Sequence, residues 1–272
     1  MELADSHGHL TMVFPGPEAR FPTRAATDDE VRDQVSRARD AGVTRILVPA
    51  TTLDDAPRVV EVAERYDGVF AAVGVHPHET RGFDEDRVIP ALERLAASAK
   101  VVAVGEIGLD YFYDFAPKDD QKRALAAQLK LAERLGKPAL LHNRESEEDL
   151  LAILESVAKG SPGAPRGVFH SFCASTATGE RAIAIGYLVS YSGMITFRMA
   201  DNVRESATAL PLEAMLVETD APYLAPAPFR GRPNEPAFVT RTAARLAEVK
   251  GVPAAEVARA TTANFRRLFG TP

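Results

Sequence analysis

Two histidines, His7 and His9, stand one residue apart near the start of the chain, in the stretch DSHGHL. In an extended strand the side chains at positions i and i+2 point to the same side, so both imidazoles can converge on one point. An isolated pair of this kind is more typical of a polar strand face than of a metal site. The other ligating side chains therefore decide how the pair is interpreted.

The remaining histidines and two carboxylates also stand in or at the ends of short apolar runs. They are His76, His78, Glu106, His142, His170 and Asp220. Random placement would have put several of these histidines on helical segments. If the fold brings the ends of the apolar runs to one place, the sequence predicts a shared site there.

Imidazole and carboxylate groups together are typical ligands of divalent metal ions. Six candidates are enough for two ions that share one bridging residue, and they are His7, His9, Glu106, His142, His170 and Asp220. A glutamate suits the bridging position because each of its oxygens can face one ion. Two ions activate water and stabilise the attacked and leaving oxygens of a displacement, so the set favours hydrolysis. Magnesium, manganese and zinc all remain open as the metal.

Arginine side chains near these residues indicate what the site binds. Arg144 follows one of the candidate ligands by two positions, and Arg230 and Arg232 stand together in PFRGRPNEP. A guanidinium fork matches phosphate oxygens, and His76 or His78 could donate to the same group. Each arginine alone could also be a solvated surface charge or the partner of a carboxylate. An arginine-bearing pocket as a whole favours phosphate.

Three other side chains near the candidate ligands have an open role. Tyr111 and Tyr113, after GEIGLD, could stack on a base, although packing against the rim of the fold is the favoured interpretation. Cys173 is the single cysteine, which excludes an internal disulfide and agrees with a reducing compartment. We expect it to be a small buried apolar residue rather than a catalytic thiol.

Eight short strand-like runs alternate with amphipathic segments along the chain. The runs are 2–9, 44–50, 69–76, 101–109, 137–143, 166–172, 187–193 and 215–221. Helical spacing is found at 27–42, 56–68, 84–100, 121–137, 146–160, 235–251 and 254–270. The first helical segment could begin with a capping box of Thr27 and Glu30. The runs start roughly thirty residues apart, about the length of a strand-helix-strand unit.

Continuous apolar runs are typical of parallel strands covered on both faces. Eight such units match a closed (β/α)8 TIM barrel, an α/β fold, formed as a single domain by residues 1–272. The alternative is a doubly wound open sheet, but no Gly-rich phosphate loop follows the first strand. The two final helical segments are then expected to complete the outer ring. In such a barrel the chemistry lies at the C-terminal ends of the strands, which is where the candidate ligands fall.

Composition and charge narrow the class of protein further. The chain has 272 residues, of which 46% are apolar and 26% charged, typical of a globular protein with an ample core. No apolar run of about 18 residues and no signal-peptide pattern occurs, so we expect a cytoplasmic protein without membrane association. No obligate protein partner is evident. The net charge of -6 argues against a broad basic surface for duplex nucleic acid but leaves room for a local basic pocket.

A series of motifs runs in order along nearly the whole chain. They are DSHGHL, GVHPHE, VGEIGLDY, LLHNRES, VFHSFCAS, YSGMITF, VETDAPYLAP with RGRPNEP, and NFRRLF. This ordered set resembles the TatD-type metal-dependent hydrolases, an amidohydrolase-like family that includes deoxyribonucleases. The resemblance implies a (β/α)8 barrel, usually two divalent ions, and activities that include 3'-to-5' exonucleolytic cleavage of DNA.

The resemblance also implies how the ligands divide. One ion would be held by His7, His9 and Asp220, and the other by His142 and His170, with Glu106 bridging. In addition, His76 would contact the scissile phosphate and Asp220 would assist as a base. Related amidohydrolases often bridge their metals with a carboxylated lysine after the fourth strand, where this chain has Glu106.

The chain departs from the family pattern around its first strand. Gly8 stands where the family commonly has cysteine or another small residue, a change that we expect to be harmless. The family often has an aspartate soon after His-x-His, and this chain reads LTMVFPGPEARF instead. That longer segment lines the loop of the first strand, so the shape of the substrate there is open. We expect Asp5 to brace the strand without binding metal.

From these residues we expect a two-metal phosphodiester hydrolase, a deoxyribonuclease that trims single-stranded DNA from its 3' end. Its catalytic residues would be Glu106 and Asp220, and its substrate-binding residues His76, Arg144, Arg230 and Arg232. One alternative is hydrolysis of an amide, a lactone or an aminoacyl ester by the same metals, because barrel sites change substrate through their loops. Another is a metal-dependent scaffold or binding protein without turnover. The intact ligand set argues against the last.

Overall fold

The computed structural model describes residues 2–16, 23–157 and 166–271. Within them eight parallel strands form one sheet, in which each strand pairs with the next one along the chain. The strands are β1 (Leu3–Asp5), β4 (Val43–Pro49), β5 (Val69–Val73), β6 (Val101–Asp110), β7 (Ala139–Arg144), β8 (Gly167–Phe169), β9 (Tyr187–Tyr191) and β10 (Met215–Val217). Two further short strands, β2 (Met12–Val13) and β3 (Arg24–Ala25), pair separately and antiparallel.

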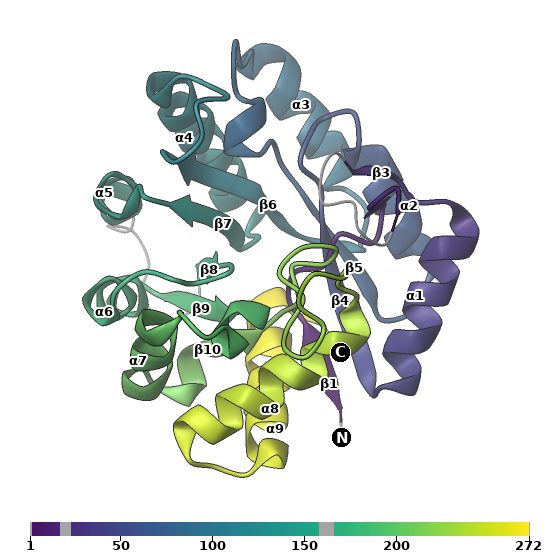
Figure 1. The fold of residues 1–272 in the computed structure, drawn as a ribbon. Helices are drawn as coiled ribbons and strands as arrows, with labels where there is room; N and C mark the ends of the chain where they lie inside the picture. The colour runs from purple at the N-terminus through teal and green to yellow at the C-terminus, as the bar shows by residue number, and fades with distance from the viewer. Residues whose placement is uncertain (1, 17–22, 158–165, 272) are drawn as a thin grey trace.

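Hydrogen bonds between the segment that follows β1 and the end of the last strand close the barrel. Ser6 N donates to Val217 O at 3.1 Å, and Gly8 and Ala221 form a parallel bridge just beyond it. Helices surround the strands, as Figure 1 shows. The (β/α)8 barrel predicted from the sequence is therefore confirmed. The doubly wound alternative is excluded, because such a sheet reverses its strand order at a switch point and this one does not.

Helices connect consecutive strands and follow the last one. They are α1 (Asp28–Asp40), α2 (Ala56–Arg65), α3 (Glu85–Leu95), α4 (Lys118–Leu135), α5 (Glu147–Val157), α6 (Thr176–Ala184), α7 (Asp201–Ala209), α8 (Val239–Lys250) and α9 (Ala254–Phe269). Short 3₁₀ turns occur at η1 (Pro77–Glu79), η3 (Gly193–Thr196), η4 (Leu212–Ala214) and η5 (Pro236–Phe238). Among the described residues, no helix is long and apolar enough to cross a lipid bilayer.

The boundaries of α1 follow from local chemistry. Glu30 N donates to the Thr27 hydroxyl, and Thr27 N donates to the Glu30 carboxylate at 2.9 Å, which is the predicted capping box. By contrast, α6 and α7 have no counterpart among the predicted helical segments. The buried positions of α6 are Thr178, Gly179 and Ala182. With no large apolar side chain at these positions, the helical period is not visible in the sequence.

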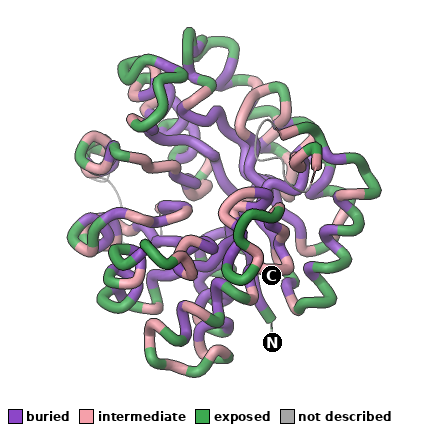
Figure 2. Tube along the Cα trace, viewed as in Figure 1, coloured by how far each residue is buried: buried purple, intermediate pink, exposed green. Residues whose placement is uncertain are grey.

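Side chains on the two faces of the strands enter two separate cores. Ile46 and Val48 of β4 pack outward among residues of the helices, whereas Leu47 belongs to an inner cluster that fills the barrel. This alternation is the two-residue period of a strand. Figure 2 shows the result, with buried positions along the strands and exposed positions on the outer faces of the helices.

The last helix contributes to both cores, because Val257 and Ala258 pack in the outer core while its C-terminal half covers one end of the barrel interior. Phe265 and Phe269 of α9 belong to the inner cluster, and the ring centroids of Phe265 and Phe70 lie 6.3 Å apart. The sequence placed both final segments in the outer ring, and it did not predict that α9 also closes the barrel interior. The open end of the barrel presents apolar side chains, and an amphipathic helix buries them.

The first strand is shorter than predicted. β1 ends at Asp5, and Ser6 forms a bend, so His7 and His9 lie in the segment that follows the strand. The predicted run of 2–9 is therefore wrong at its C-terminal end. Hydrogen bonds to the chain beyond β10, together with the one from Gly8 N to Leu47 O of β4, fix the two histidines.

Candidate metal centre

His7, His9 and Asp220 meet where the first and last strands end. Asp220 N donates to His7 O at 2.8 Å, and His9 N donates to Ala221 O at 2.8 Å. The Nε2 atoms of His7 and His9 lie 3.1 Å apart. Asp220 Oδ1 lies 3.7 Å from His7 Nε2 and 3.6 Å from His9 Nε2. The two imidazoles therefore converge as predicted, although both lie beyond β1.

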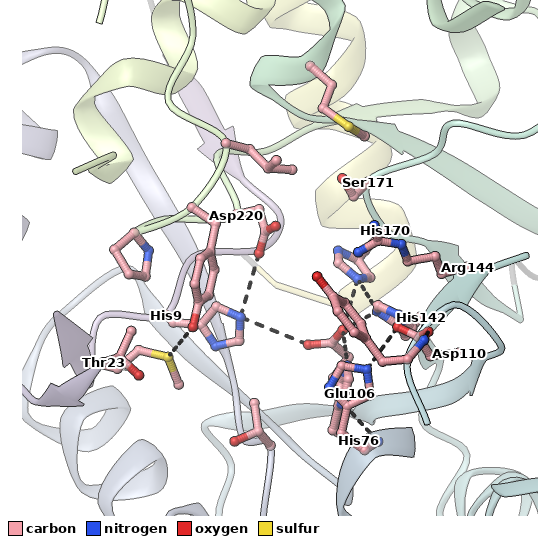
Figure 3. A pocket seen from close by; sticks show the side chains of 18 of the residues that line it. His9, Thr23, His76, Glu106, Asp110, His142, Arg144, His170, Ser171 and Asp220 are labelled. Carbon is pink, nitrogen blue, oxygen red and sulfur yellow. Dashed lines mark hydrogen bonds and ion pairs between the residues drawn. The ribbon is translucent and has the colours of Figure 1, made fainter. Parts of the chain in front are cut away.

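Glu106, from β6, lies between histidines on two sides, and Figure 3 shows it with His9 on one side and His142 and His170 on the other. Its Oε2 atom is 3.3 Å from His7 Nε2 and 3.9 Å from His9 Nε2. Its Oε1 atom is 3.0 Å from His142 Nδ1 and 2.8 Å from His170 Nε2. The two carboxylate oxygens therefore face different imidazoles, an arrangement that suits a bridging glutamate.

His76 belongs to the same cluster. Its Nε2 atom is 3.4 Å from Glu106 Oε1, and its ring centroid is 4.6 Å from that of His142. The turn η1 fixes this orientation, because His78 N donates to His76 Nδ1 at 3.2 Å. His76 can therefore contact either a cation or a substrate oxygen beside Glu106.

The ligating atoms are close enough to hold cations. Three groups each have their nitrogen and oxygen atoms within 4.8 Å of one another, namely His7 with His170 and Asp220, His7 with His9 and Glu106, and His76 with Glu106 and His142. Imidazole nitrogens and carboxylate oxygens that converge in a buried place are compensated either by protons on the imidazoles or by a cation between them. The donor set, mixed nitrogen and oxygen, fits a divalent metal ion.

Burial and mutual attraction set the charges of the cluster. Burial raises the pKa of Glu106, but the fields of His170 and His7 outweigh it and hold that pKa well below its usual range. Burial lowers the pKa of His170, but Glu106 and Glu218 outweigh it and raise that pKa well above its usual value. Burial lowers the pKa of His76 to about 4, so its imidazole is neutral at pH 7. Glu106 is therefore ionised, and its negative charge attracts cations and protonated imidazoles.

Two further buried carboxylates, Asp110 and Glu218, contact the histidines of the cluster on the side away from Glu106. The sequence pattern did not identify either of them. Asp110 Oδ2 lies 2.8 Å from His78 Nε2 and 3.0 Å from His142 Nε2. Glu218 Oε1 lies 3.3 Å from His170 Nδ1. Asp110 ends β6 in GEIGLD, and Glu218 follows β10 in VETD. This position at a strand end is the sequence feature that could have identified them. Such partners orient metal-binding imidazoles and make them more basic.

Asp5 supports the segment that contains His7. It accepts hydrogen bonds from Thr219 N at 2.9 Å, from Thr219 Oγ1 at 2.5 Å and from His7 N at 3.3 Å. Burial raises the pKa of Asp5 to about 8. Asp5 therefore links the ends of the first and last strands, which is the bracing role expected of it.

Unusual backbone conformations occur at the same end of the barrel. Ser171 and Asp220 are non-glycine residues with φ angles of 45° and 55°, a conformation that surrounding contacts must enforce. Gly108 has φ 151°, and a Cβ atom there would lie 2.0 Å from His142 O. Only glycine lets β6 and β7 pair this closely beside Glu106 and His142.

A cavity of about 930 Å³ opens over the cluster. The three predicted arginines, Arg144, Arg230 and Arg232, all line it. The guanidinium of Arg144 lies 3.9 Å from the centroid of the Phe112 ring, and that of Arg230 lies 3.5 Å from the Phe197 ring. The volume lies within the range of small-ligand sites.

Cys173 also lines the cavity and is half-buried, not buried as expected. Burial raises the pKa of its thiol. A protonated thiol is a poor nucleophile. The cysteine therefore contributes surface to the cavity and no activated sulfur.

A (β/α)8 barrel with imidazoles and carboxylates gathered at the C-terminal ends of its strands defines the class of metal-dependent hydrolases. The family model described as TatD related DNase matches residues 4–270. The chain belongs to this family, so the resemblance found in the motifs is confirmed.

Relatives and solved structures agree with the family. The chain is 34% identical to the uncharacterized metal-dependent hydrolase YabD of Bacillus subtilis (strain 168), over 98% of both chains. It is 35% identical to the 3'-5' ssDNA/RNA exonuclease TatD of Shigella flexneri serotype 5b, over 88% of this chain and 92% of the relative. The crystal structure of YJJV, a TatD homologue from Escherichia coli K12, superposes with a TM-score of 0.86 at 35% identity, over 99% of this chain and 98% of that chain.

Proposed function

We propose that the protein is a two-metal phosphodiester hydrolase that trims single-stranded DNA from its 3' end. The observation that supports two ions is the position of Glu106, whose oxygens lie 2.8–3.9 Å from two separate pairs of histidines. One ion would be held by His7, His9 and Asp220, the other by His142 and His170, with Glu106 between them. Relatives named 3'-5' ssDNA/RNA exonuclease support a nucleic acid as the substrate.

The chain's own residues supply the proton acceptor. When bound, the ions would lower the pKa of a water molecule and neutralise charge on the phosphate oxygens. Burial raises the pKa of Asp220, but its hydrogen bond with His9 and the field of His7 outweigh it and lower that pKa below its usual value. Asp220 is therefore ionised at pH 7, and its carboxylate can take up the proton of the attacking water.

Arg144 is placed to bind the phosphate. It ends β7, lines the cavity and rests against aromatic rings. Within the part of the chain that the structure describes, no carboxylate forms an ion pair with it. Its fork can donate two parallel hydrogen bonds to phosphate oxygens. His76, which lies beside Glu106 and lines the cavity, would reach the same phosphate. The exposed Arg230 and Arg232 would bind phosphates farther along the strand.

The shape and charge of the molecule favour a strand end over a duplex. A cavity of about 930 Å³ has the size of a small-ligand site. The net charge of -6 leaves no surplus for the broad basic surface that grips long duplexes. A single strand can place its terminal nucleotide in such a cavity.

An assay on labelled oligonucleotides with single-stranded 3' tails tests this proposal. Protein supplemented with magnesium, manganese or zinc should shorten the tail stepwise and stop at the duplex. Arg144→Ala should raise KM for the tail, whereas Arg87→Ala, an exposed arginine of α3, should not. RNA tails of the same sequence test the preference for DNA. Activity confined to a parallel panel of amides, lactones and aminoacyl esters would overturn the nuclease proposal, and the arginines would then bind a substrate carboxylate.

Three further expectations from the sequence stay predictions. They are the single domain of residues 1–272, a cytoplasmic location, and function without an obligate protein partner.

A further inference from the structure

Exposed aromatic side chains gather in one short loop beside the metal centre. Among the described residues, four large apolar side chains are strongly exposed: Phe112 at 51%, Tyr113 at 39%, Phe115 at 55% and Met199 at 83%. Three of the four fall within the loop of residues 111–117, which joins β6 to α4 and is called the aromatic loop below. A cluster of exposed apolar surface at the rim of a cavity marks a place where something binds.

The aromatic loop is continuous with the candidate site. Tyr113 and Phe115 both line the cavity over the cluster. Their rings stack on each other with centroids 5.3 Å apart. His78, which lies beside both rings, is 4.8 Å from Phe115 by ring centroid and shares Asp110 with His142. The platform formed by Tyr113 and Phe115 is therefore separated from the candidate metal ligands by a single layer of side chains.

Hydrogen bonds hold the aromatic loop in its exposed position. Asp110 Oδ1 accepts from Phe112 N at 2.9 Å and from Tyr113 N at 3.0 Å. The buried Gln121 of α4 binds both ends of the loop, because its Nε2 donates to Asp110 O at 2.9 Å and to Ala116 O at 3.0 Å. The rings are thus presented to solvent by a fixed backbone. Such preorganisation lowers the entropic cost of binding.

Tyr111 is not part of this platform. Its hydroxyl donates to Asp149 Oδ2 at 2.6 Å, and Lys118 Nζ lies 4.0 Å from its ring. These contacts place Tyr111 in the packing of the rim, the role that the sequence favoured. Of the two tyrosines after GEIGLD, only Tyr113 is free to face a ligand.

Positive charge adjoins the platform. The guanidinium of Arg144 lies 3.9 Å from the Phe112 centroid and 4.9 Å from the Tyr113 centroid. An apolar ring stack beside a guanidinium suits a ligand that carries a flat aromatic group next to an anion. A nucleotide has this chemistry, because its base is planar and its phosphate is negative. The bases of a duplex are already stacked on both faces, so only a single strand offers a base with a free face.

We propose that Tyr113 and Phe115 form a stacking platform for a nucleobase next to the phosphate that is cut. This inference rests on the proposed nuclease function and adds the recognition of a base to it. The platform would select single-stranded nucleic acid without strong sequence preference, because every base has a face to stack. It also positions the strand so that its phosphate lies between Arg144 and His76.

Phe115→Ala is the variant that tests the platform, with two substrates. One is a single-stranded oligonucleotide, and the other is the same strand with abasic residues at its last three 3' positions. The variant should lower kcat/KM on the first on the order of 10- to 100-fold and leave the second unchanged. Phe115→Trp should keep the rate on both, because it retains a stacking face.

The matched control is Met199→Ala, which removes a still more exposed apolar side chain that does not line the cavity. It should leave both rates unchanged. Equal loss on both substrates in Phe115→Ala would show a structural role for the ring and overturn the platform. No loss on either would overturn it as well.

A binding measurement separates failure of the platform from failure of the nuclease proposal. Stacking quenches the fluorescence of 2-aminopurine, so a strand with this base at its 3' end should dim on binding the wild type and not on binding Phe115→Ala. Quenching without cleavage would keep the platform and overturn the nuclease proposal. Cleavage without quenching would overturn the platform alone, and the absence of both would overturn both.

Discussion

The two ends of the barrel interior are built from opposite kinds of side chain. At the C-terminal end the buried groups are carboxylates and imidazoles, including Asp5, Glu106, Glu218, His7 and His170. At the other end α9 inserts Phe265, Leu268 and Phe269 among the inward-facing apolar residues of the strands. The same strands contribute to both ends. The residues that stabilise the fold and those that could do chemistry therefore lie in separate places. Substitutions at one end should change the free energy of unfolding, and substitutions at the other should change activity.

Buried charge at the C-terminal end persists because each group compensates another. Burial raises the pKa of Glu106, and it is the surrounding histidines that keep this carboxylate ionised. Such a cluster adds little net stability, because the attraction among its members largely offsets the free-energy cost of burying them. We therefore expect variants at this end to change activity more than the free energy of unfolding.

The largest effect is expected for Glu106→Ala. Without the bridging carboxylate, turnover should fall on the order of 10³-fold or more, beyond the loss of a single hydrogen-bond donor. The barrel should stay folded by circular dichroism. Glu79→Ala, an exposed carboxylate that also lines the cavity, should keep the wild-type rate. A near wild-type rate for Glu106→Ala at matched metal content would show that the bridging assignment is wrong.

The opposite end should respond in the opposite way. Phe265→Ala removes a fully buried ring from the inner cluster and should lower the free energy of unfolding by about 3–5 kcal/mol. Urea denaturation measures this loss. The kcat of the protein that remains folded should stay unchanged. A lower kcat at full folding would show that the two ends are coupled.

A smaller effect on activity is expected for Asp110→Asn. The amide keeps an oxygen that accepts from the aromatic loop, but it no longer offers a carboxylate to His78 and His142. Activity or metal affinity should fall about 10- to 100-fold. Asp114→Asn, an exposed aspartate of the same loop, is the matched control. If both variants behave alike, Asp110 does not orient the histidines.

The smallest effect is expected in the outer ring, away from both ends. Thr27→Ala removes half of the capping box of α1 and should lower the free energy of unfolding by about 1 kcal/mol. Activity should be unchanged. Thermal unfolding measures the loss, and a change in turnover would mean that the outer ring influences the site.

Much of this organisation is predictable from the sequence. The apolar runs predict the barrel because each strand is buried on both faces, and the ligands converge because parallel strands end at one rim. The two helices without a predicted counterpart, α6 and α7, have small or polar residues at most buried positions, so their period is hidden. β1 ends at Asp5 because the residues after it form hydrogen bonds with the chain at and beyond β10. The residue pattern within the first segment does not reveal these distant contacts.

The roles of single carboxylates are less predictable. Asp110 and Glu218 lie within four residues of Glu106 and Asp220 in the same two motifs, and sequence position alone does not separate a residue that contacts the cluster from one that orients a histidine. The two roles differ in which nitrogen of His142 the carboxylate contacts. Glu106 lies beside Nδ1, whereas Asp110 lies beside Nε2 on the opposite side of the ring. That distinction requires three-dimensional coordinates.

The central claim is that one carboxylate, Glu106, holds two divalent ions between two pairs of histidines. Elemental analysis of the purified chain after metal supplementation and removal of loosely bound ions tests it most directly. We expect two ions per chain for the wild type and fewer for Glu106→Ala. One ion or fewer in the wild type, or two ions retained in Glu106→Ala, would contradict it.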